Sequence, residues 1–463
     1  MKIEMPAGAG FIITELNRHG YEAFIVGGCV RDALLGKTPN DWDITTSAPP
    51  EAVKDIFLQR QGTKTVDTGI QHGTVTVIVG RGLMHELTED DTQPYAFEVT
   101  TYRVDGRYED HRRPSEVTFT ASLEEDLKRR DFTINAMAYN DDRGIIDIFG
   151  GRRDLEDGII RCVGNPSERF DEDVLRILRA VRFAAQLGFK IDEPTRKAMQ
   201  EQAEFLRDIS AERIQVELTK LIMSDNPGML VEAYRLGLTG VFLPEFDVMM
   251  QTEQNNPYHM YSVGMHTIKV MENTPKDMVL RYAALLHDVG KPDCKTTDED
   301  GVDHFYGHQV RGEKMANEIL RRLKLDNNTI DRVKRLVLNH DYGISNENTN
   351  IRALRRFLAK LGNENFGDFV AIRRADMAGQ SEYKLMQRQK AIDELIETQK
   401  IIVNENQCLK ISDLAINGKD LIRLGVMPGP ELGRILKQIM EMVFDDPELN
   451  ERDRLMELAK ELI

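Results

Sequence analysis

Two aspartates lie two residues apart near the start of the chain, in the stretch NDWDITT over residues 40–46. Apolar Trp42 and Ile44 alternate with Asp41 and Asp43, which is the two-residue period of a strand. Side chains two apart on a strand point to the same face, so the two carboxylates should stand together. Carboxylates that close raise each other's pKa unless a cation lies between them. The stretch by itself fits a metal site and a solvated strand edge equally well.

A pair of glycines precedes these aspartates, in the stretch FIVGGCVRD over residues 24–32. Gly27 and Gly28 between a predicted strand and a predicted helix would let backbone N–H groups approach a phosphate. Arg31, one turn into that helix, could reach the same anion. A phosphate site beside metal-binding carboxylates is what phosphoryl transfer requires, so the combination is more specific than either part.

Farther along, one acid and three arginines follow each other at intervals of three, and they are Asp173, Arg176, Arg179 and Arg182. This spacing predicts that they share one helix face. An ion pair on a solvated helix explains the first two residues. The alternative is an edge that reads a nucleobase, since a carboxylate accepts from an exocyclic amine and a guanidinium donates to ring acceptors. Cytosine and adenine offer that combination, whereas uracil and guanine present the opposite order.

A second set of polar residues lies at predicted helix ends in the middle of the chain, in YSVGMHTIKV, ALLHDVGKP, YGHQVRG, LNHDYG and RRADMAG. The set resembles the HD phosphohydrolase superfamily. The resemblance implies a divalent metal held by His266, His287, Asp288 and Asp376, with Lys291, His308 and His340 nearby for phosphate. Imidazole and carboxylate together suit Mn, Fe, Ni, Co or Zn better than Mg alone. A scaffold that kept these residues without the activity is the competing interpretation.

The elements that must position these groups differ between the two parts of the chain. Up to residue 150 the pattern mixes strands, expected at 21–26, 74–79 and 96–102, with helices after Gly27-Gly28 and over 49–57. From residue 152 onward apolar residues recur at three and four, and alternation is absent. We therefore expect an α+β fold, with a head over 1–150, a helical neck over 151–225, a helical body over 226–400 and a helical tail over 401–463. Glu98, on the strand at 96–102, is a candidate third carboxylate, and residues 107–114 read as a loop.

Composition limits the classes of function. The chain has 463 residues, of which 30% are charged and 41% hydrophobic, as expected for a soluble protein of several domains. We expect no membrane span and no signal peptide, and the four cysteines have no metal or disulfide spacing. This favours a cytoplasmic protein. A net charge of −16 argues against a protein that coats nucleic acid without specificity.

The ordered motifs identify a known family. FIVGGCVRDALLG and NDWDITT are followed by KRRDFTINAMAY, DIFGGRRDL, EDVLRILRAVRFAAQLGF and ERIQVELTKLI. The series resembles the class II tRNA nucleotidyltransferases and bacterial poly(A) polymerases, a branch of the polymerase-β-like superfamily. The resemblance implies that Asp41 and Asp43 hold two Mg²⁺ ions and that Gly28, Arg31 and Arg130 contact the nucleotide. It further implies that Asp173 and Arg176 select the base.

The expected reaction is the addition of CCA, from CTP and ATP, to the 3′ end of tRNA. Within the class, the alternatives are an A-adding enzyme and a poly(A) polymerase, and the stretches HGTVTV and DGRYEDHRRP favour the CCA type. A metal phosphohydrolase that uses the head to hold RNA, and a tRNA-binding protein without catalysis, are further alternatives. The complete sets Asp41/Asp43 and Asp173/Arg176 speak against the phosphohydrolase, and a tRNA-binding protein without catalysis leaves both metal sites unexplained.

Overall fold

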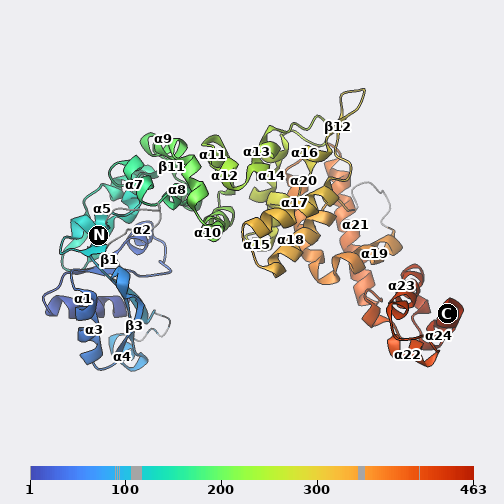
Figure 1. Cartoon of the computed structure of the whole chain (residues 1–463), viewed down its shortest axis with the longest axis horizontal. Helices are drawn as coiled ribbons and strands as arrows, with labels where there is room; N and C mark the ends of the chain where they lie inside the picture. Colours follow the sequence, from blue (N-terminus) through green and yellow to red (C-terminus); the bar gives the residue numbers. More distant parts are fainter. Residues whose placement is uncertain are drawn as a thin grey trace. The chain divides into compact units, whose positions relative to one another are not determined.

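The computed structural model describes residues 2–88, 90, 92, 94–105, 117–342, 350–405 and 407–463. The chain divides into two compact units, Met1–Phe242 and Leu243–Ile463, and each is described here by itself (Figure 1). Strands are concentrated in the first unit and the second is almost entirely helical, so the expected α+β class is confirmed. Among the described residues no helix has the length and apolar character needed to cross a membrane. The predicted boundaries at 150, 225 and 400 stay predictions.

The first unit, unit 1, is built on a seven-stranded sheet with the order β3-β4-β5-β2-β1-β8-β9. β2 and β5 are parallel, and every other neighbouring pair is antiparallel. Apolar side chains alternate along β4, so that Val75, Val77 and Val79 are buried. The strands are β1 (Ala23–Val26), β2 (Ile44–Thr46), β3 (Thr63–Gly69), β4 (Thr74–Val79), β5 (Ala96–Thr101), β8 (Met137–Asn140) and β9 (Gly144–Asp147).

Helices pack around this sheet and continue beyond it. Pro50 begins α3 and Pro166 begins α7, because proline fits the first turn of a helix, where its missing N–H costs nothing. The helices of unit 1 are α1 (Ala7–Arg18), α2 (Gly28–Leu34), α3 (Pro50–Gln59), α4 (Arg81–Leu87), α5 (Leu123–Lys128), α6 (Gly151–Asp157), α7 (Pro166–Glu172), α8 (Leu175–Leu187), α9 (Glu193–Glu201), α10 (Ala211–Ile222), α11 (Leu230–Arg235) and α12 (Thr239–Phe242). The predicted strands and helices around Gly27-Gly28 are therefore confirmed.

One expectation about strands is wrong. The stretch NDWDITT is not a strand throughout, because β2 begins at Ile44 and both aspartates precede it. The alternation nevertheless holds, since Trp42 and Ile44 are buried and both aspartates are exposed. After residue 152 the chain is almost entirely helical, as expected, apart from short pairs between β10 (Ile159–Ile160) and β11 (Lys190–Ile191) and between β12 (Thr296–Thr297) and β13 (Asp303–His304). In unit 1, β6 (Arg103–Asp105) and β7 (Val117–Phe119) form a further pair.

Asp173 is not on the helix that carries Arg176, contrary to prediction. α7 ends at Glu172, Asp173 has an extended backbone with φ −144°, and α8 begins at Leu175. The physical reason is a cap, because the Asp173 carboxylate accepts a hydrogen bond of 3.1 Å from the backbone N–H of Leu175. The acid thus ends one helix and starts the next.

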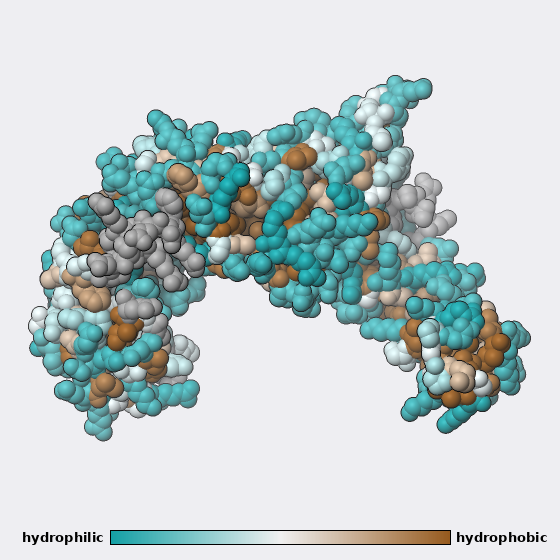
Figure 2. Space-filling view, viewed as in Figure 1, coloured by the Kyte–Doolittle hydropathy of each residue, from teal (hydrophilic) through white to brown (hydrophobic). Residues whose placement is uncertain are grey.

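The second unit, unit 2, is built from helices around α14, which packs against α13, α15 and α20. Its last three helices enclose an apolar cluster that includes Leu421, Ile435 and Leu455. Figure 2 shows hydrophobic residues at the surface of this last part of the chain, and Met427 is among the exposed ones. The helices are α13 (Pro244–Gln251), α14 (Val263–Glu272), α15 (Met278–Leu286), α16 (Lys291–Cys294), α17 (His308–Arg322), α18 (Asn327–Asn339), α19 (Ile351–Leu361), α20 (Phe366–Ala378), α21 (Leu385–Asn404), α22 (Gly418–Arg423), α23 (Pro430–Asp445) and α24 (Arg452–Leu462).

Candidate functional site

Three carboxylates meet at one end of the parallel strand pair in unit 1. Ile44 of β2 is opposite Val99 of β5, so the residues before them, Asp43 and Glu98, are neighbours. Desolvation by the surrounding protein raises the pKa of Asp43; Arg130 opposes this effect, while Glu98 and Asp41 add to it. The side chains of all three acids nevertheless reach solvent. Three exposed carboxylates whose negative charges lie close together form a group that a cation would stabilise.

The glycine turn lies directly beside these acids. The backbone N–H of Val26 donates to the carbonyl oxygen of Asp43 at 3.0 Å, which fixes the turn against the aspartate. Gly27 has φ +83°, and a Cβ there would lie 3.0 Å from Nη1 of Arg130. A Cβ on Gly28 would lie 3.6 Å from Nη2 of Arg31. The two arginines that were predicted to contact the nucleotide therefore flank the turn.

Buried acceptors hold these two arginines in place. Arg130 donates to Asp126 at 3.2 Å, and the same carboxylate, fully buried, also accepts from Arg129 at 2.7 Å. Burial alone would raise the pKa of Asp126, but the charges of Arg130 and Arg129 lower it below its usual value. Arg31 donates to Asn135 Oδ1 at 2.6 Å and to Asp32 at 2.8 Å. Both guanidinium groups are thus fixed before any ligand binds.

Helix α8 brings two further arginines to the same place. The Phe183 ring lies under three guanidinium groups, with centroid distances of 5.1, 5.4 and 3.9 Å to Arg31, Arg179 and Arg182. Arg179 donates to Asp131 at 2.6 Å. Burial would raise the pKa of Asp131, but Arg179 lowers it to about 2. Arg182 pairs with Glu217 at 3.1 Å, and burial lowers its pKa to about 10.

Asp173 and Arg176, the predicted base-selecting pair, do not contact each other through their side chains. Asp173 pairs with Arg213 of α10 at 2.9 Å. Arg176 donates to Glu172 at 2.7 Å and to the carbonyl oxygens of Arg169 and Arg129 at 3.1 and 2.9 Å. The ion pair expected on a solvated helix is therefore absent, and each residue has its own protein partner. Asp173 remains partly exposed, whereas Arg176 is buried.

Several residues that hold the site were not singled out from the sequence. Asp126 lies just before the stretch KRRDFTINAMAY, which includes Asp131 and Asn135, and Phe183 lies within RAVRFAAQLGF. A buried acid that holds an arginine leaves no spacing pattern of its own. Only the position of these residues in or beside the motifs could have indicated them. The predicted loop over residues 107–114 lies outside the residues that the structure describes.

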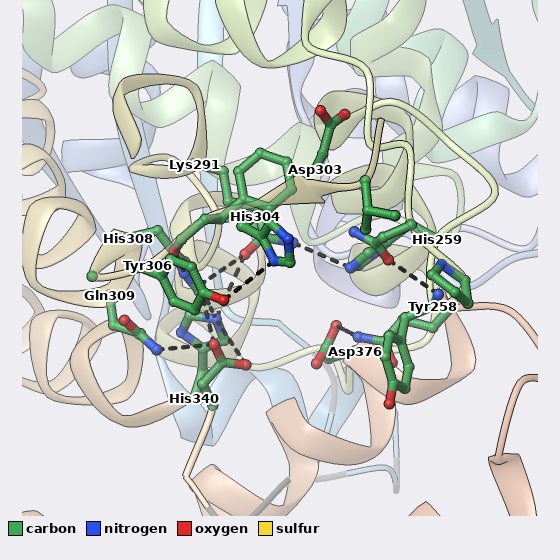
Figure 3. Close-up of a pocket in the computed structure, with 18 residues that line it drawn as sticks. Tyr258, His259, Lys291, Asp303, His304, Tyr306, His308, Gln309, His340 and Asp376 are labelled. Carbon is green, nitrogen blue, oxygen red and sulfur yellow. Dashed lines mark hydrogen bonds and ion pairs between the residues drawn. The ribbon is translucent and has the colours of Figure 1, made fainter. Parts of the chain in front are cut away.

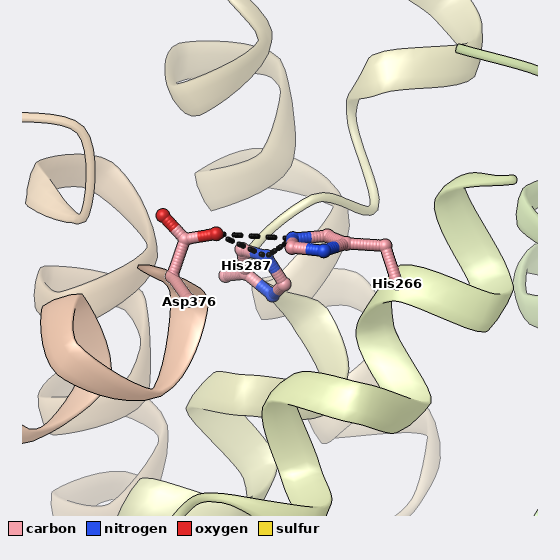
Figure 4. Close-up of side chains that lie close together, drawn as sticks. All are labelled: His266, His287 and Asp376. Atoms are coloured by element: carbon pink, nitrogen blue, oxygen red, sulfur yellow. Dashed lines mark hydrogen bonds and ion pairs between the residues drawn. The ribbon is translucent and has the colours of Figure 1, made fainter. Parts of the chain in front are cut away.

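The polar residues of unit 2 come together in a buried cluster. His266 and His287 approach each other to 3.3 Å between their Nε2 atoms, and Asp376 Oδ1 lies 3.0 Å from His266 Nε2 and 4.0 Å from His287 Nε2 (Figure 4). A second group adjoins the first, with 3.2 Å between the Nε2 atoms of His308 and His340. Asp288 completes that group. Within the described residues, these are the two groups of three whose ligand atoms lie within 4.8 Å of one another.

A pocket of about 390 Å³ opens onto both groups (Figure 3). Lys291 lies in its wall, with Nζ 2.8 Å from Asp288 Oδ2. The structure thus brings together all seven polar residues predicted for the middle of the chain. His308 and His340 lie against Asp288, 3.5 and 3.6 Å from Oδ1, and their expected role at a phosphate stays a prediction. His304 and Tyr306, also in the pocket wall, were not expected.

Three family models match successive parts of the chain. The poly(A) polymerase head domain matches residues 23–161. An RNA- and SrmB-binding site of polymerase A matches residues 188–250, and tRNA nucleotidyltransferase domain 2 matches residues 307–459. The first of these covers the sheet, the glycine turn and all three carboxylates of unit 1.

Relatives extend over nearly the full length. A CCA-adding enzyme of Pediococcus pentosaceus is 37% identical over 456 residues, which cover 97% of this chain and 96% of that protein. One from Leuconostoc mesenteroides is 35% identical over 457 residues, 98% of this chain and 95% of that protein. The crystal structure of the Bacillus stearothermophilus CCA-adding enzyme in complex with CTP matches with a TM-score of 0.70 at 30% identity, over 99% and 98% of the two chains. By fold, motif order and full-length identity, the chain belongs to the family of the CCA-adding enzymes.

Proposed function

We propose that the chain adds CCA to the 3′ end of tRNA, using CTP and ATP and releasing pyrophosphate at each step. The observation that carries this proposal is the assembly of Asp41, Asp43 and the Gly27 turn beside Arg130, in a chain whose full-length relatives are named CCA-adding enzymes. Carboxylates that can hold a cation beside a phosphate-binding turn are the parts that nucleotidyl transfer requires.

The residues of the head have separate tasks in this reaction. Asp41 and Asp43, whose crowded carboxylates suit a hard cation, would hold Mg²⁺. When bound, Mg²⁺ supplies positive charge that acidifies the attacking 3′-hydroxyl and stabilises the departing pyrophosphate. The amides of the Gly27-Gly28 turn and the side chains of Arg31 and Arg130 would hold the triphosphate. Because buried acceptors already fix both arginines, little side-chain entropy is lost when the nucleotide binds.

Base selection is assigned to Asp173 and Arg176. The partly exposed Asp173 carboxylate would accept from the exocyclic amine of cytosine or adenine, in place of its hydrogen bond from Arg213. Arg176 would donate to a ring acceptor only after it releases one of its protein partners. Arg179 and Arg182 lie on the same helix and add positive charge near the nucleotide. Selection in this proposal therefore requires a local exchange of partners.

The test offers each nucleotide separately to tRNAs that lack CCA, lack only the final A, or are complete. We expect C to be added twice, then A once, and the complete tRNA to remain unchanged. Extension solely of the tRNA that lacks the final A would turn the assignment to an A-adding enzyme. Long A tails from ATP alone would turn it to a poly(A) polymerase.

A second activity is supported by the histidine–aspartate cluster of unit 2. Four imidazoles and two carboxylates that converge beside a pocket form a donor set suited to a transition metal, and Lys291 adds a cation for phosphate. We assign this cluster a metal-dependent hydrolysis of phosphoesters. Hydrolysis of 2′,3′-cyclic nucleotides by the metal-loaded protein is the first assay. No metal binding and no hydrolysis of any phosphoester tested would leave the cluster as an inactive scaffold.

A further inference from the structure

The fully buried carboxylate of Asp126 lies between the two parts of the candidate site in unit 1. Its Oδ2 accepts from Nη2 of Arg130 at 3.2 Å and from the hydroxyl of Thr45 at 3.2 Å. Its Oδ1 accepts from Arg129 at 2.7 Å. Thr45 belongs to β2 and follows Asp43 by two positions. One side chain thus joins the strand next to the metal-binding acids to an arginine that would bind the triphosphate.

Arg130 itself lies between two acids. Its Nη2 is held by Asp126, whereas its Nη1 lies at the glycine turn, 3.0 Å from where a Cβ on Gly27 would be. The residue before that glycine, Val26, bonds to the carbonyl oxygen of Asp43. Desolvation raises the pKa of Asp43, and the charge of Arg130 opposes this effect. Nε of Arg130 is buried and has no hydrogen-bond partner within the part of the chain that the structure describes, so the bond to Asp126 restrains this guanidinium.

Loss of the negative charge on Asp126 would leave Arg129 and Arg130 as two neighbouring cations without their buried counter-ion. A guanidinium released in this way pairs with another carboxylate within reach, because such bonds are charge-assisted. For Arg130 that carboxylate is Asp43, on which its charge already acts. An arginine bound to Asp43 would occupy its oxygens and repel a divalent cation.

We infer that Asp126 is a positioning residue of nucleotidyl transfer, which keeps Arg130 directed at the nucleotide and away from the metal-binding carboxylate of Asp43. The inference rests on the proposed addition of CCA, because that proposal assigns Asp43 to Mg²⁺ and Arg130 to the triphosphate. Asp126 itself touches neither of them in this view. It acts by leaving the charge of Asp43 free for Mg²⁺.

The competing role of Asp126 is purely structural. It would then only join α5 to β2 through Thr45, and its loss would lower stability without changing the affinity of the folded molecules for metal or nucleotide. Asp154 offers a matched control, because it is also buried and accepts from a threonine, Thr133 at 2.6 Å, and from an arginine, Arg161 at 3.1 Å. Neither of these partners is assigned to the nucleotide.

The test measures Mg²⁺ dependence and CTP binding in the full-length protein. In Asp126→Asn, the Mg²⁺ concentration for half-maximal CCA addition should rise about tenfold or more, because Arg130 competes for Asp43. Much of the rate should return at saturating Mg²⁺. Binding of CTP in the presence of a chelator, measured by equilibrium dialysis, should weaken about tenfold, because Arg130 is drawn away from the triphosphate. Asp154→Asn should lower the melting temperature and change neither quantity.

The double variant Asp126→Asn/Arg130→Gln separates competition from distortion of the site. Once the charge of Arg130 is removed, the Mg²⁺ requirement should return to within about twofold of that of the unmodified protein, although turnover stays low. A Mg²⁺ requirement that is unchanged in Asp126→Asn, or that is still raised in the double variant, overturns the inference.

A second variant covers the case in which Asp126→Asn does not fold, as judged by its melting temperature. Asp126→Asn/Arg129→Gln then replaces it, because these changes remove one buried charge of each sign and still release Arg130. If the unmodified protein adds no nucleotide to tRNA, the proposed function fails, whereas CTP binding in the chelator still decides the role of Asp126. Equal CTP affinity with and without the Asp126 carboxylate would overturn that role.

Discussion

Asp43 combines three effects in one side chain. It adjoins the glycine turn through its backbone, is the neighbour of Glu98 on the parallel strand, and lies near enough to Arg130 for that charge to oppose the desolvation that raises its pKa. Asp43→Asn should lower nucleotide addition about a thousandfold or more, because a metal ion stabilises the transition state by several kcal/mol. Binding of tRNA should stay nearly unchanged, as measured by filter binding. Near-normal turnover would contradict the assignment, and Glu98→Gln serves as the comparison for a less central carboxylate.

Asp173 and Arg176 can be tested separately, because each has its own partner. Asp173→Ala should lose its preference for bases with an exocyclic amine and admit UTP, with a loss in selectivity of about ten- to hundredfold for hydrogen bonds worth about 1–3 kcal/mol. Arg176→Ala should weaken the use of CTP and ATP together. Selectivity per active enzyme and melting temperature are the two measurements.

Arg213→Ala is the matched control for this experiment. It removes the protein partner of Asp173 but keeps the carboxylate, so base preference should persist. If Asp173→Ala and Arg213→Ala lower the melting temperature alike and neither changes base preference, the ion pair between Asp173 and Arg213 is structural and Asp173 does not select the base.

Asp131 links acidity to stability. Its pKa is about 2 in the folded chain against 3.8 for an ordinary aspartate, because Arg179 outweighs the effect of burial. An acid whose pKa is lower in the folded chain than in the unfolded chain stabilises the fold at any pH above its unfolded pKa. That stabilisation is lost as the pH falls through the folded pKa. The expected contribution, on the order of 2 kcal/mol, should be lost between about pH 4 and pH 2. Chemical denaturation of Asp131→Asn should lack this part of the acid dependence shown by the natural sequence.

At the scale of elements, the turn between β1 and α2 depends on one backbone conformation. Gly27 has φ +83°, a backbone conformation that residues with a Cβ atom rarely adopt. A Cβ atom at this position would also lie only 3.0 Å from Nη1 of Arg130. Gly27→Ala should destabilise unit 1 by about 1–3 kcal/mol and reduce nucleotide addition beyond what the lower stability explains. The measurement is KM for CTP at a temperature where the variant is fully folded. Gly36→Ala is the control, because it shares the positive φ but has open space around it.

The sequence predicted those elements whose local pattern agrees with their environment. β1, α2, α3, β4 and β5 were expected because alternation, a glycine turn and a double proline mark them. Asp173 was misplaced because a spacing of three looks the same whether or not a cap interrupts the helix. The ion pair between Asp173 and Arg213 joins the start of α8 to α10. Because its partners are far apart in the sequence, no local sequence pattern predicts it. Likewise, the sequence grouped His308 and His340 correctly with the cluster, but only the tertiary fold sets them against Asp288.

At the scale of the whole molecule, the two candidate sites lie in different units, each with its own core. His287→Ala combined with Asp288→Ala should therefore leave the rate of CCA addition within about twofold, since changes at independent sites act separately. The same change should abolish metal-dependent phosphoester hydrolysis. Both rates are measured on one preparation of the full-length protein. A large loss of CCA addition without loss of folding would mean that the two sites are coupled.

The order of strands in the sheet has a consequence for how the chain emerges from the ribosome. β1 pairs with β2, which lies close in sequence, but its other neighbour is β8, more than a hundred residues later, and β2 needs β5 on its far side. Contacts between distant segments form slowly, and an unpaired strand edge is prone to aggregation until they do. A nascent chain that has exposed the two aspartates therefore still lacks both Glu98 and the support of β8. The head therefore cannot assemble its three carboxylates before β5 and β8, which ends at Asn140, have been synthesised.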